Sequence, residues 1–117
     1  AVASLRPDMV ALAQLGELGV SCFAASGTGW KTRMFAPALG VTEDPATGSA
    51  AGPLAVHLAR HRQIAFGETI EISQGAEIGR PSTLRARTAE DGDRIERVEV
   101  GGAAVILGGG TFSVPPE

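Results

Sequence analysis

The sequence predicts an α+β fold, in which a strongly curved mixed or antiparallel sheet of about six strands surrounds one helix and a second helix lies beside it. Three observations support this prediction. Six short segments are alternating or β-branched and are bounded by Gly, Pro or Asp, as strands are. Two longer segments carry apolar residues at helical spacing. The chain has 117 residues, which fits a single domain over residues 1–117.

Both expected helices lie in the first half of the chain. Apolar residues at helical spacing predict a helix over residues 7–18, with Pro7 or Asp8 at its start and Gly19 as its stop. Residues 50–61 are rich in alanine and leucine and predict a second helix. Because this second helix is apolar on nearly all sides, we expect the sheet to bury it.

The expected strands share short length and flanking turn residues. They are residues 20–25, 32–36, 69–73, 82–88, 94–100 and 103–107, with residues 37–47 expected to be irregular. Glycines at strand ends are expected to supply the positive φ that tight corners and bulges need. These glycines are Gly75, Gly79, Gly101, Gly102 and Gly108–Gly110.

Composition and charge exclude several classes of partner. The net charge is −3, and the aromatic residues are four Phe and one Trp with no Tyr. A basic face with stacking aromatics, which nucleic-acid binding requires, is therefore not expected. No apolar run reaches about 18 residues, so no membrane partner is expected. The one cysteine, Cys22, excludes an internal disulfide and fits a reducing compartment, which predicts a cytoplasmic location.

Three further motifs do not support a site. Residues 27–32 have a glycine-rich start before Lys31, but a phosphate loop needs glycine directly before that lysine and a helix after it. His57 and His61 have the i, i+4 spacing of zinc ligands, yet no third ligand is evident, so they are expected to lie at a helix end. Cys22 lies in an apolar strand and is expected to be an inert packed thiol. We therefore expect no metal.

The segment Glu43–Gly52 leads into the second helix and is the most informative part of the chain for function. The first turn of a helix has amides without intrahelical partners and carries about half a positive charge, so it attracts anions. Glycines keep this end free of side chains, Ser49 adds a hydroxyl, and Asp44 lies just upstream as a candidate acid or base. The residues alone leave a second reading open, in which Ser49 or Thr47 only caps the helix and the Asp-Pro step forms a turn.

The nine residues Asp44–Gly52, Asp-Pro-Ala-Thr-Gly-Ser-Ala-Ala-Gly, resemble the signature of the PhzF family, the phenazine biosynthesis-like isomerases related to diaminopimelate epimerase. The resemblance covers roughly residues 18–110 because further motifs follow in the family's order. These motifs are Arg33–Pro37 upstream, and Gln74–Gly75, Gly79–Ser82 and Val100–Val105 downstream.

The resemblance implies that the chain is the C-terminal lobe of a two-lobed protein with a diaminopimelate epimerase-like fold. The active site would lie in the cleft between the lobes and catalyse isomerisation without a cofactor, by proton transfer at a carbon of a small carboxylate substrate. By the same resemblance, Asp44 and Ser49 are catalytic, and Thr47, Gly48, Ser49 and Ala50 bind substrate. The family's principal catalytic glutamate belongs to the N-terminal lobe, and no residue here is assigned its role.

Three hypotheses about partners follow. In the first, a separate N-terminal lobe completes the active site. In the second, two copies form a homodimer that places two helix N-termini and two Asp44 carboxyl groups across one cleft. In the third, the chain is a non-catalytic half-protein that binds a small carboxylate or serves a structural role.

Overall fold

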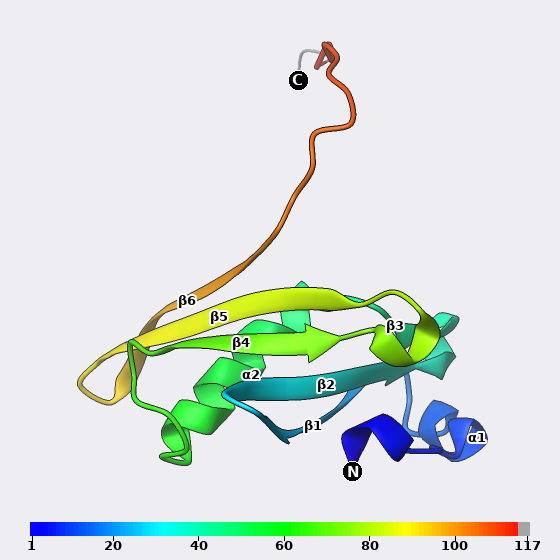
Figure 1. The fold of residues 1–117 in the computed structure, drawn as a ribbon, viewed down its shortest axis with the longest axis horizontal. Coiled ribbons are helices and arrows are strands. Elements are labelled where there is room, and N and C mark those ends of the chain that lie inside the picture. The colour runs from blue at the N-terminus through cyan, green and yellow to red at the C-terminus, as the bar shows by residue number, and fades with distance from the viewer. Residues whose placement is uncertain (115–117) are drawn as a thin grey trace.

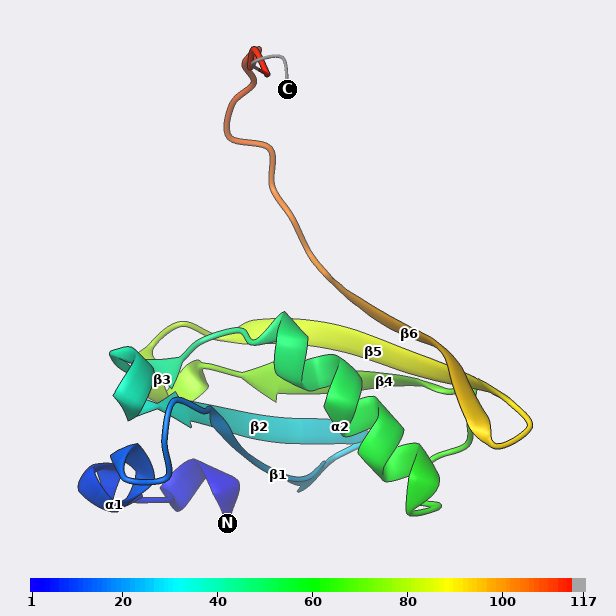
Figure 2. The same cartoon turned by 180° about the vertical axis from the view of Figure 1, so that it is seen from behind.

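A six-stranded mixed sheet forms the body of the protein in a computed structural model that describes residues 1–114. Its strands are β1 (Val20–Ser26), β2 (Gly29–Ala36), β3 (Val41–Asp44), β4 (Thr69–Gln74), β5 (Ser82–Asp91) and β6 (Arg94–Gly102). The helices are α1 (Met9–Ala13) and α2 (Gly48–Arg60), with single 3₁₀ turns at Val2–Ser4, Pro37–Leu39 and Ala76–Ile78. Helix α2 lies across one face of the sheet (Figures 1 and 2). The predicted α+β class is therefore confirmed.

The strands are arranged in the order β1-β2-β4-β5-β6, and β3 pairs with β2 beside this path. All neighbours are antiparallel except β2 and β4, which run parallel through the pairs Trp30–Ile72 and Lys31–Ser73. Two-residue turns join β1 to β2 and β5 to β6, and each turn begins with a glycine at φ +59° (Gly27 and Gly92). Such turns match the twist of the flanking strands.

The core lies between one side of α2 and the sheet. Helix residues Leu54, Ala55 and Leu58 are buried against apolar side chains of β4 and β5, which are Ile70, Ile72, Leu84 and Ala86. At Gly52 a Cβ atom would lie 2.7 Å from Val98 Cγ1, so glycine allows α2 to approach β6 this closely. The other side of α2 is exposed at Pro53, His57 and Arg60. The expectation that this helix is buried on nearly all sides is wrong, because the sheet covers one side only.

Helix α1 is shorter than the predicted helix over residues 7–18. The Asp8 carboxylate caps it by accepting hydrogen bonds from the amides of Val10 and Ala11, both at 3.0 Å. After Gln14 the chain leaves the helix, and Gly16 adopts φ +106°, which a helix does not allow. The helix therefore ends at Ala13 and not at the predicted Gly19.

The sixth strand is not the predicted one. Residues 37–47, expected to be irregular, contain β3. Residues 103–107 form no strand, and the C-terminal tail, residues 103–114, runs away from the sheet (Figures 1 and 2). The tail exposes the apolar side chains of Val105, Ile106, Leu107, Phe112 and Val114. Its apolar pattern is that of a strand, but no neighbouring strand within residues 1–114 pairs with it.

The other strand predictions are close, with two corrections. Strand β2 begins three residues earlier than expected, at Gly29, and β5 ends three residues later than expected, at Asp91. Strand β1 is an edge strand and is only half-buried. Among the glycines expected to have positive φ, Gly75 and Gly79 do, at +83° and +70°. The others do not, and Gly101 and Gly102 lie within β6.

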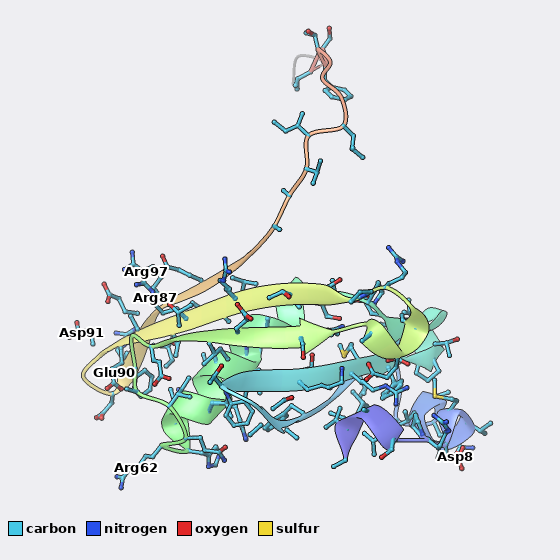
Figure 3. The ribbon with its side chains drawn as sticks, viewed as in Figure 1. Asp8, Arg62, Arg87, Glu90, Asp91 and Arg97 are labelled. Carbon is cyan, nitrogen blue, oxygen red and sulfur yellow. The ribbon has the colours of Figure 1, made fainter. Side chains whose placement is uncertain are left out.

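Charged side chains gather on the β5–β6 hairpin (Figure 3). Glu90 and Asp91 lie near its tip, and Arg87 donates hydrogen bonds of 2.8 Å and 2.6 Å to Oε2 of Glu99 across the hairpin. These bonds hold the pKa of Glu99 below its ordinary value. This end of the molecule is thus a solvated ion-pair surface.

Two general findings concern the described residues together. Within residues 1–114, no helix combines the length and the apolar character that a membrane crossing requires. In the same range, no three side chains of His, Cys, Asp or Glu come together as a metal site. His57 and His61 lie at the end of α2 with their ring centroids 4.3 Å apart.

Candidate active site

Asp44 is the last residue of β3 and is half-buried. The preceding residue, Glu43, binds Arg33 on β2 through two hydrogen bonds of 2.8 Å, Nε to Oε1 and Nη2 to Oε2. Both side chains are 7 % exposed, and the bond to Glu43 raises the pKa of Arg33. This ion pair anchors β3 on β2 and thereby fixes the end of the strand, where Asp44 lies.

Thr47 links Asp44 to the start of α2. It is buried, and its hydroxyl donates a hydrogen bond to Oδ2 of Asp44 at 2.5 Å. It occupies the position before the first helical residue but makes no capping bond with its side chain. The reading in which Thr47 caps α2 with its hydroxyl is therefore wrong, because that hydroxyl serves Asp44 instead.

The first turn of α2 keeps free amides. Ala50 and Ala51 both donate to the Thr47 carbonyl at 3.1 Å, whereas the amides of Gly48 and Ser49 have no acceptor among residues 1–114. Gly48 and Ser49 are also exposed. Two adjacent free amides and the Ser49 hydroxyl at a helix N-terminus form a suitable set of hydrogen-bond donors for a carboxylate. Of the four residues predicted to bind substrate, Gly48 and Ser49 therefore offer free donors.

Two hollows flank the start of α2. One, of about 370 Å³, is lined by Ser49 and Ala50 together with Phe23 and Met34 of the β1–β2 hairpin. The other, of about 540 Å³, is lined by Gly48 on the opposite side, with the beginning of β5 and the end of β6. Asp44 borders neither hollow. The helix end is thus open on both sides, and Asp44 lies at the turn that enters it.

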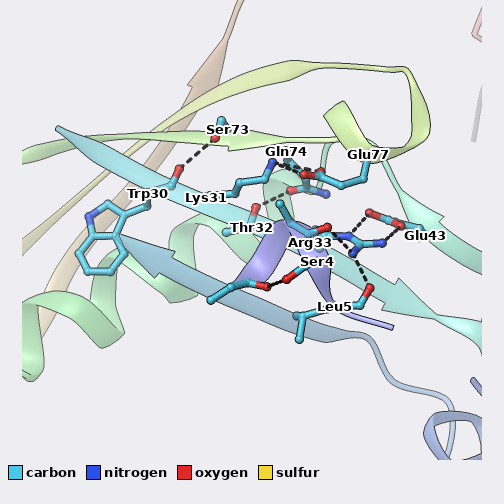
Figure 4. Close-up of polar contacts among 12 residues, drawn as sticks. Ser4, Leu5, Trp30, Lys31, Thr32, Arg33, Glu43, Ser73, Gln74 and Glu77 are labelled. Atoms are coloured by element: carbon cyan, nitrogen blue, oxygen red, sulfur yellow. Dashed lines mark hydrogen bonds and ion pairs between the residues drawn. The ribbon is translucent and has the colours of Figure 1, made fainter. Parts of the chain in front are cut away.

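Three consecutive side chains of β2 support this region (Figure 4). Each binds a residue of another segment, 10 to 46 positions later in the sequence. The pairs are Lys31 with Glu77, Thr32 with Gln74, and Arg33 with Glu43. Strand β2 therefore holds both the end of β3 and the segment after β4, which together enclose the Asp44–Thr47 turn.

The pair of Lys31 and Glu77 predicts a specific acid sensitivity. Burial alone would raise the pKa of Glu77, but the hydrogen bond from Lys31, a backbone hydrogen bond and the charges of Lys31 and Arg33 outweigh it and hold this pKa below its ordinary value. A carboxyl group whose pKa is lowered by folding stabilises the folded state at pH values above its ordinary pKa. This stabilisation is lost as the pH falls through the lowered pKa. We expect Lys31→Met to make the loss of unfolding free energy below about pH 4.5 shallower than in the wild type.

Urea unfolding between about pH 6 and pH 3 measures this effect. The control is Arg85→Met, because Arg85 and its partner Glu71 are 66 % and 62 % exposed and 3.6 Å apart. That substitution should leave the pH dependence close to the wild-type curve. An identical curve for Lys31→Met would contradict the assigned cause.

Gln74 belongs to this region but was not among the residues predicted for the site. Its side chain is 3 % exposed and bonds to Thr32, Thr47 and the Asp44 carbonyl. A signal was present in the sequence, because alternation along β4 puts Gln74 on the same buried face as Ile70 and Ile72. A polar residue on a buried face needs polar partners, and those partners prove to be the Asp44–Thr47 turn.

Comparison with known proteins gives concordant matches. The model of the family described as phenazine biosynthesis-like protein (PhzC-PhzF) matches residues 1–110. The chain is 56 % identical over 112 residues to the trans-2,3-dihydro-3-hydroxyanthranilate isomerase of Pseudomonas chlororaphis, covering 96 % of this chain and 40 % of that protein. It is 59 % identical over 102 residues to the enzyme of the same name from Pseudomonas aeruginosa, covering 87 % and 37 %.

A solved structure, described as that of a predicted epimerase from Pseudomonas aeruginosa, shares the fold. Its TM-score is 0.55 at 33 % identity, and the match covers 90 % of this chain and 37 % of that chain. The chain thus spans about two fifths of the length of the curated relatives it matches. The family match, the relatives and the shared fold agree with the motif around Asp44, and the chain belongs to the PhzF family of phenazine biosynthesis-like proteins.

Proposed function

We propose that this chain is the C-terminal lobe of a PhzF-type isomerase that moves a proton between carbons of a small carboxylate substrate without a cofactor. The observation that supports this most directly is the Asp44 carboxyl group beside a helix start with two free amides. The names of the relatives, which are isomerases of trans-2,3-dihydro-3-hydroxyanthranilate, support the substrate class.

Each site residue then has a distinct task. The amides of Gly48 and Ser49 bind the substrate carboxylate and stabilise negative charge when a proton leaves carbon. Asp44 exchanges a proton with the substrate, and a second acid-base group removes or returns the other proton, so that the composition of the substrate is unchanged. The hydroxyl of Ser49 is exposed and donates to the same ligand.

The second acid-base group comes from a partner in this proposal. The chain corresponds to about two fifths of its relatives, and the remaining part would form the opposite lobe of the cleft. The open side of α2 and the hollows beside it are the surfaces that such a partner would cover. A second copy of the chain is the alternative partner, because it would bring a second Asp44 to the same cleft.

A chimaeric protein tests the proposal. Residues 1–110 of this chain, the range that the family model matches, replace the corresponding segment of the Pseudomonas chlororaphis isomerase. This chimaera is incubated with trans-2,3-dihydro-3-hydroxyanthranilate in deuterated water. We expect isomerisation with deuterium incorporation at carbon, and a loss of at least about 100-fold in rate with Asp44→Asn, because general acid-base groups contribute this much or more. Ser49→Ala should weaken substrate binding.

The matched controls are Asp93→Asn, in the turn between β5 and β6, and Ser26→Ala, at the end of β1. Both should retain the parent rate. A folded chimaera without exchange would overturn the proposal, and exchange that survives Asp44→Asn unchanged would remove Asp44 from the mechanism. Exchange by the chain alone, with a dimeric mass in light scattering, would favour the second copy as partner. Binding without exchange would favour the non-catalytic carboxylate-binding reading.

A further inference from the structure

The amide group of Gln74 connects four polar groups around the entry to α2. Its Oε1 accepts hydrogen bonds from the Thr32 hydroxyl at 3.1 Å and from the Thr47 amide at 3.4 Å. Its Nε2 donates to the Asp44 carbonyl at 2.6 Å and to the Thr47 hydroxyl oxygen at 2.9 Å. The oxygen and both protons of this buried amide are therefore engaged in hydrogen bonds.

Two backbone groups determine which way the amide of Gln74 faces. The Asp44 carbonyl can only accept a hydrogen bond, and the Thr47 amide can only donate one. Turning the Gln74 amide by 180° would set its nitrogen against the Thr47 N–H and its oxygen against the Asp44 carbonyl. Both contacts would be repulsive, so Nε2 must face Asp44 and Oε1 must face the Thr47 amide.

This orientation also directs the hydroxyl proton of Thr47. A threonine hydroxyl has one proton to donate, and its oxygen already accepts from Nε2 of Gln74. The proton therefore points to Oδ2 of Asp44, its acceptor at 2.5 Å. Oδ2 is thus the oxygen that Thr47 engages, whereas no hydrogen bond within residues 1–114 engages Oδ1 of Asp44.

Gly75 lies against the same turn. A Cβ atom at this residue would lie 2.7 Å from the Pro45 carbonyl oxygen and 3.0 Å from Pro45 Cα. The end of β4 is thus in close contact with the turn that follows Asp44. Gln74 supplies the polar bonds to this turn, and Gly75 allows the backbone approach that brings the Gln74 amide within reach.

We propose that Gln74 is a positioning residue that aims the Thr47 hydroxyl at Oδ2 of Asp44 and so leaves Oδ1 as the oxygen that exchanges protons with substrate. The role of Oδ1 in proton exchange with substrate rests on the proposed function. The hydrogen bonds by which Gln74 aims the Thr47 hydroxyl do not depend on it. The proposal makes Thr47 a supporting residue for Asp44 and not a contact for the substrate.

The first experiment is independent of activity and uses the whole chain. NMR measures hydrogen exchange of the Gln74 side-chain amide, with the exposed Gln63 as an internal reference. We expect exchange at Gln74 to be slower by at least about 10-fold, because both its protons are bonded and buried. Thr47→Val keeps the shape but removes the hydroxyl, and it should speed this exchange, whereas Thr47→Ser should preserve the protection.

The second experiment uses the chimaera described above. Thr47→Val is expected to lower kcat by about 10- to 100-fold while KM changes less than about twofold, because Asp44 is misplaced and the ligand contacts remain. Thr47→Ser should recover most of kcat, and Gln74→Met should resemble Thr47→Val. The control is Thr88→Val, since Thr88 is also buried and its hydroxyl binds the Arg97 carbonyl on the distant hairpin.

The outcomes separate the two proposals. If Gln74 exchanges as fast as Gln63, or if Thr47→Val leaves its exchange unchanged, the positioning role is overturned whatever the activity. A rise in KM without a fall in kcat would make Thr47 a substrate contact and would also overturn it. An inactive parent chimaera with a protected Gln74 amide would overturn the proposed function while leaving the bond network established.

Discussion

Replacing Gly75 with alanine is expected to lower the free energy of unfolding by at least about 3 kcal/mol. Gly75 has φ +83°, and an added Cβ would overlap the Arg80 carbonyl oxygen and lie 2.7 Å from that of Pro45. Both are backbone atoms, so relief requires two chain segments to move. Urea unfolding followed by the fluorescence of Trp30, the one tryptophan, measures the change.

Gly79 provides the matched control for Gly75. It also has positive φ, at +70°, but an added Cβ would meet no atom within 4 Å. Gly79→Ala should therefore lower the free energy of unfolding only by the cost of positive φ for alanine, about 1 kcal/mol. Equal losses at both glycines would show that the approach to Pro45 and Arg80 is not what makes Gly75 necessary.

Removing the guanidinium of Arg33 should have a comparably large effect. We expect Arg33→Met to cost about 3–5 kcal/mol, because Glu43 would remain buried without its partner. The same guanidinium donates to the carbonyls of Ala3 and Leu5, at 3.3 Å and 2.9 Å, and thus ties the N-terminal segment to the sheet. Calorimetry and urea unfolding report the loss.

Two further variants test whether the unpaired charge is the cause. Arg33→Met combined with Glu43→Leu should recover much of the stability, since an apolar pair of similar size can replace a buried ion pair. Arg85→Met removes a pair that is 66 % and 62 % exposed and should cost less than about 1 kcal/mol. A loss for Arg33→Met no larger than that for Arg85→Met would contradict the importance of burial.

The start of α2 was predictable from the sequence because its signals are local. Glycines near Ser49, with Asp44 just upstream, indicate an open helix entry, and the family motif covers the same nine residues. The bonds that hold Asp44 were not predictable in this way. Gln74 is separated from Asp44 by 30 residues, and alternation along β4 indicates only that its side chain is buried, not which groups it meets.

The two largest errors in the fold have one cause. Residues 7–18 have helical periodicity and residues 103–107 have apolar strand character, yet neither segment forms the full predicted element. Periodicity shows which face of an element would be buried, but an element also needs a surface to pack against or a strand to pair with. Leu15 and Leu18 are 60 % and 42 % exposed, which shows that no such surface covers them within the described residues.

The parallel pairing of β2 with β4 has a consequence for how the site comes into being. Thr32 bonds to a residue 42 positions later, and the contacts between Gln74 and the Asp44–Thr47 turn span 27 to 30 positions. Closing loops of this length costs entropy before any of these bonds forms, so no short stretch of chain can assemble the site by itself. The alignment of Asp44 therefore depends on completion of the entire sheet, and it is lost when that cooperative unit unfolds.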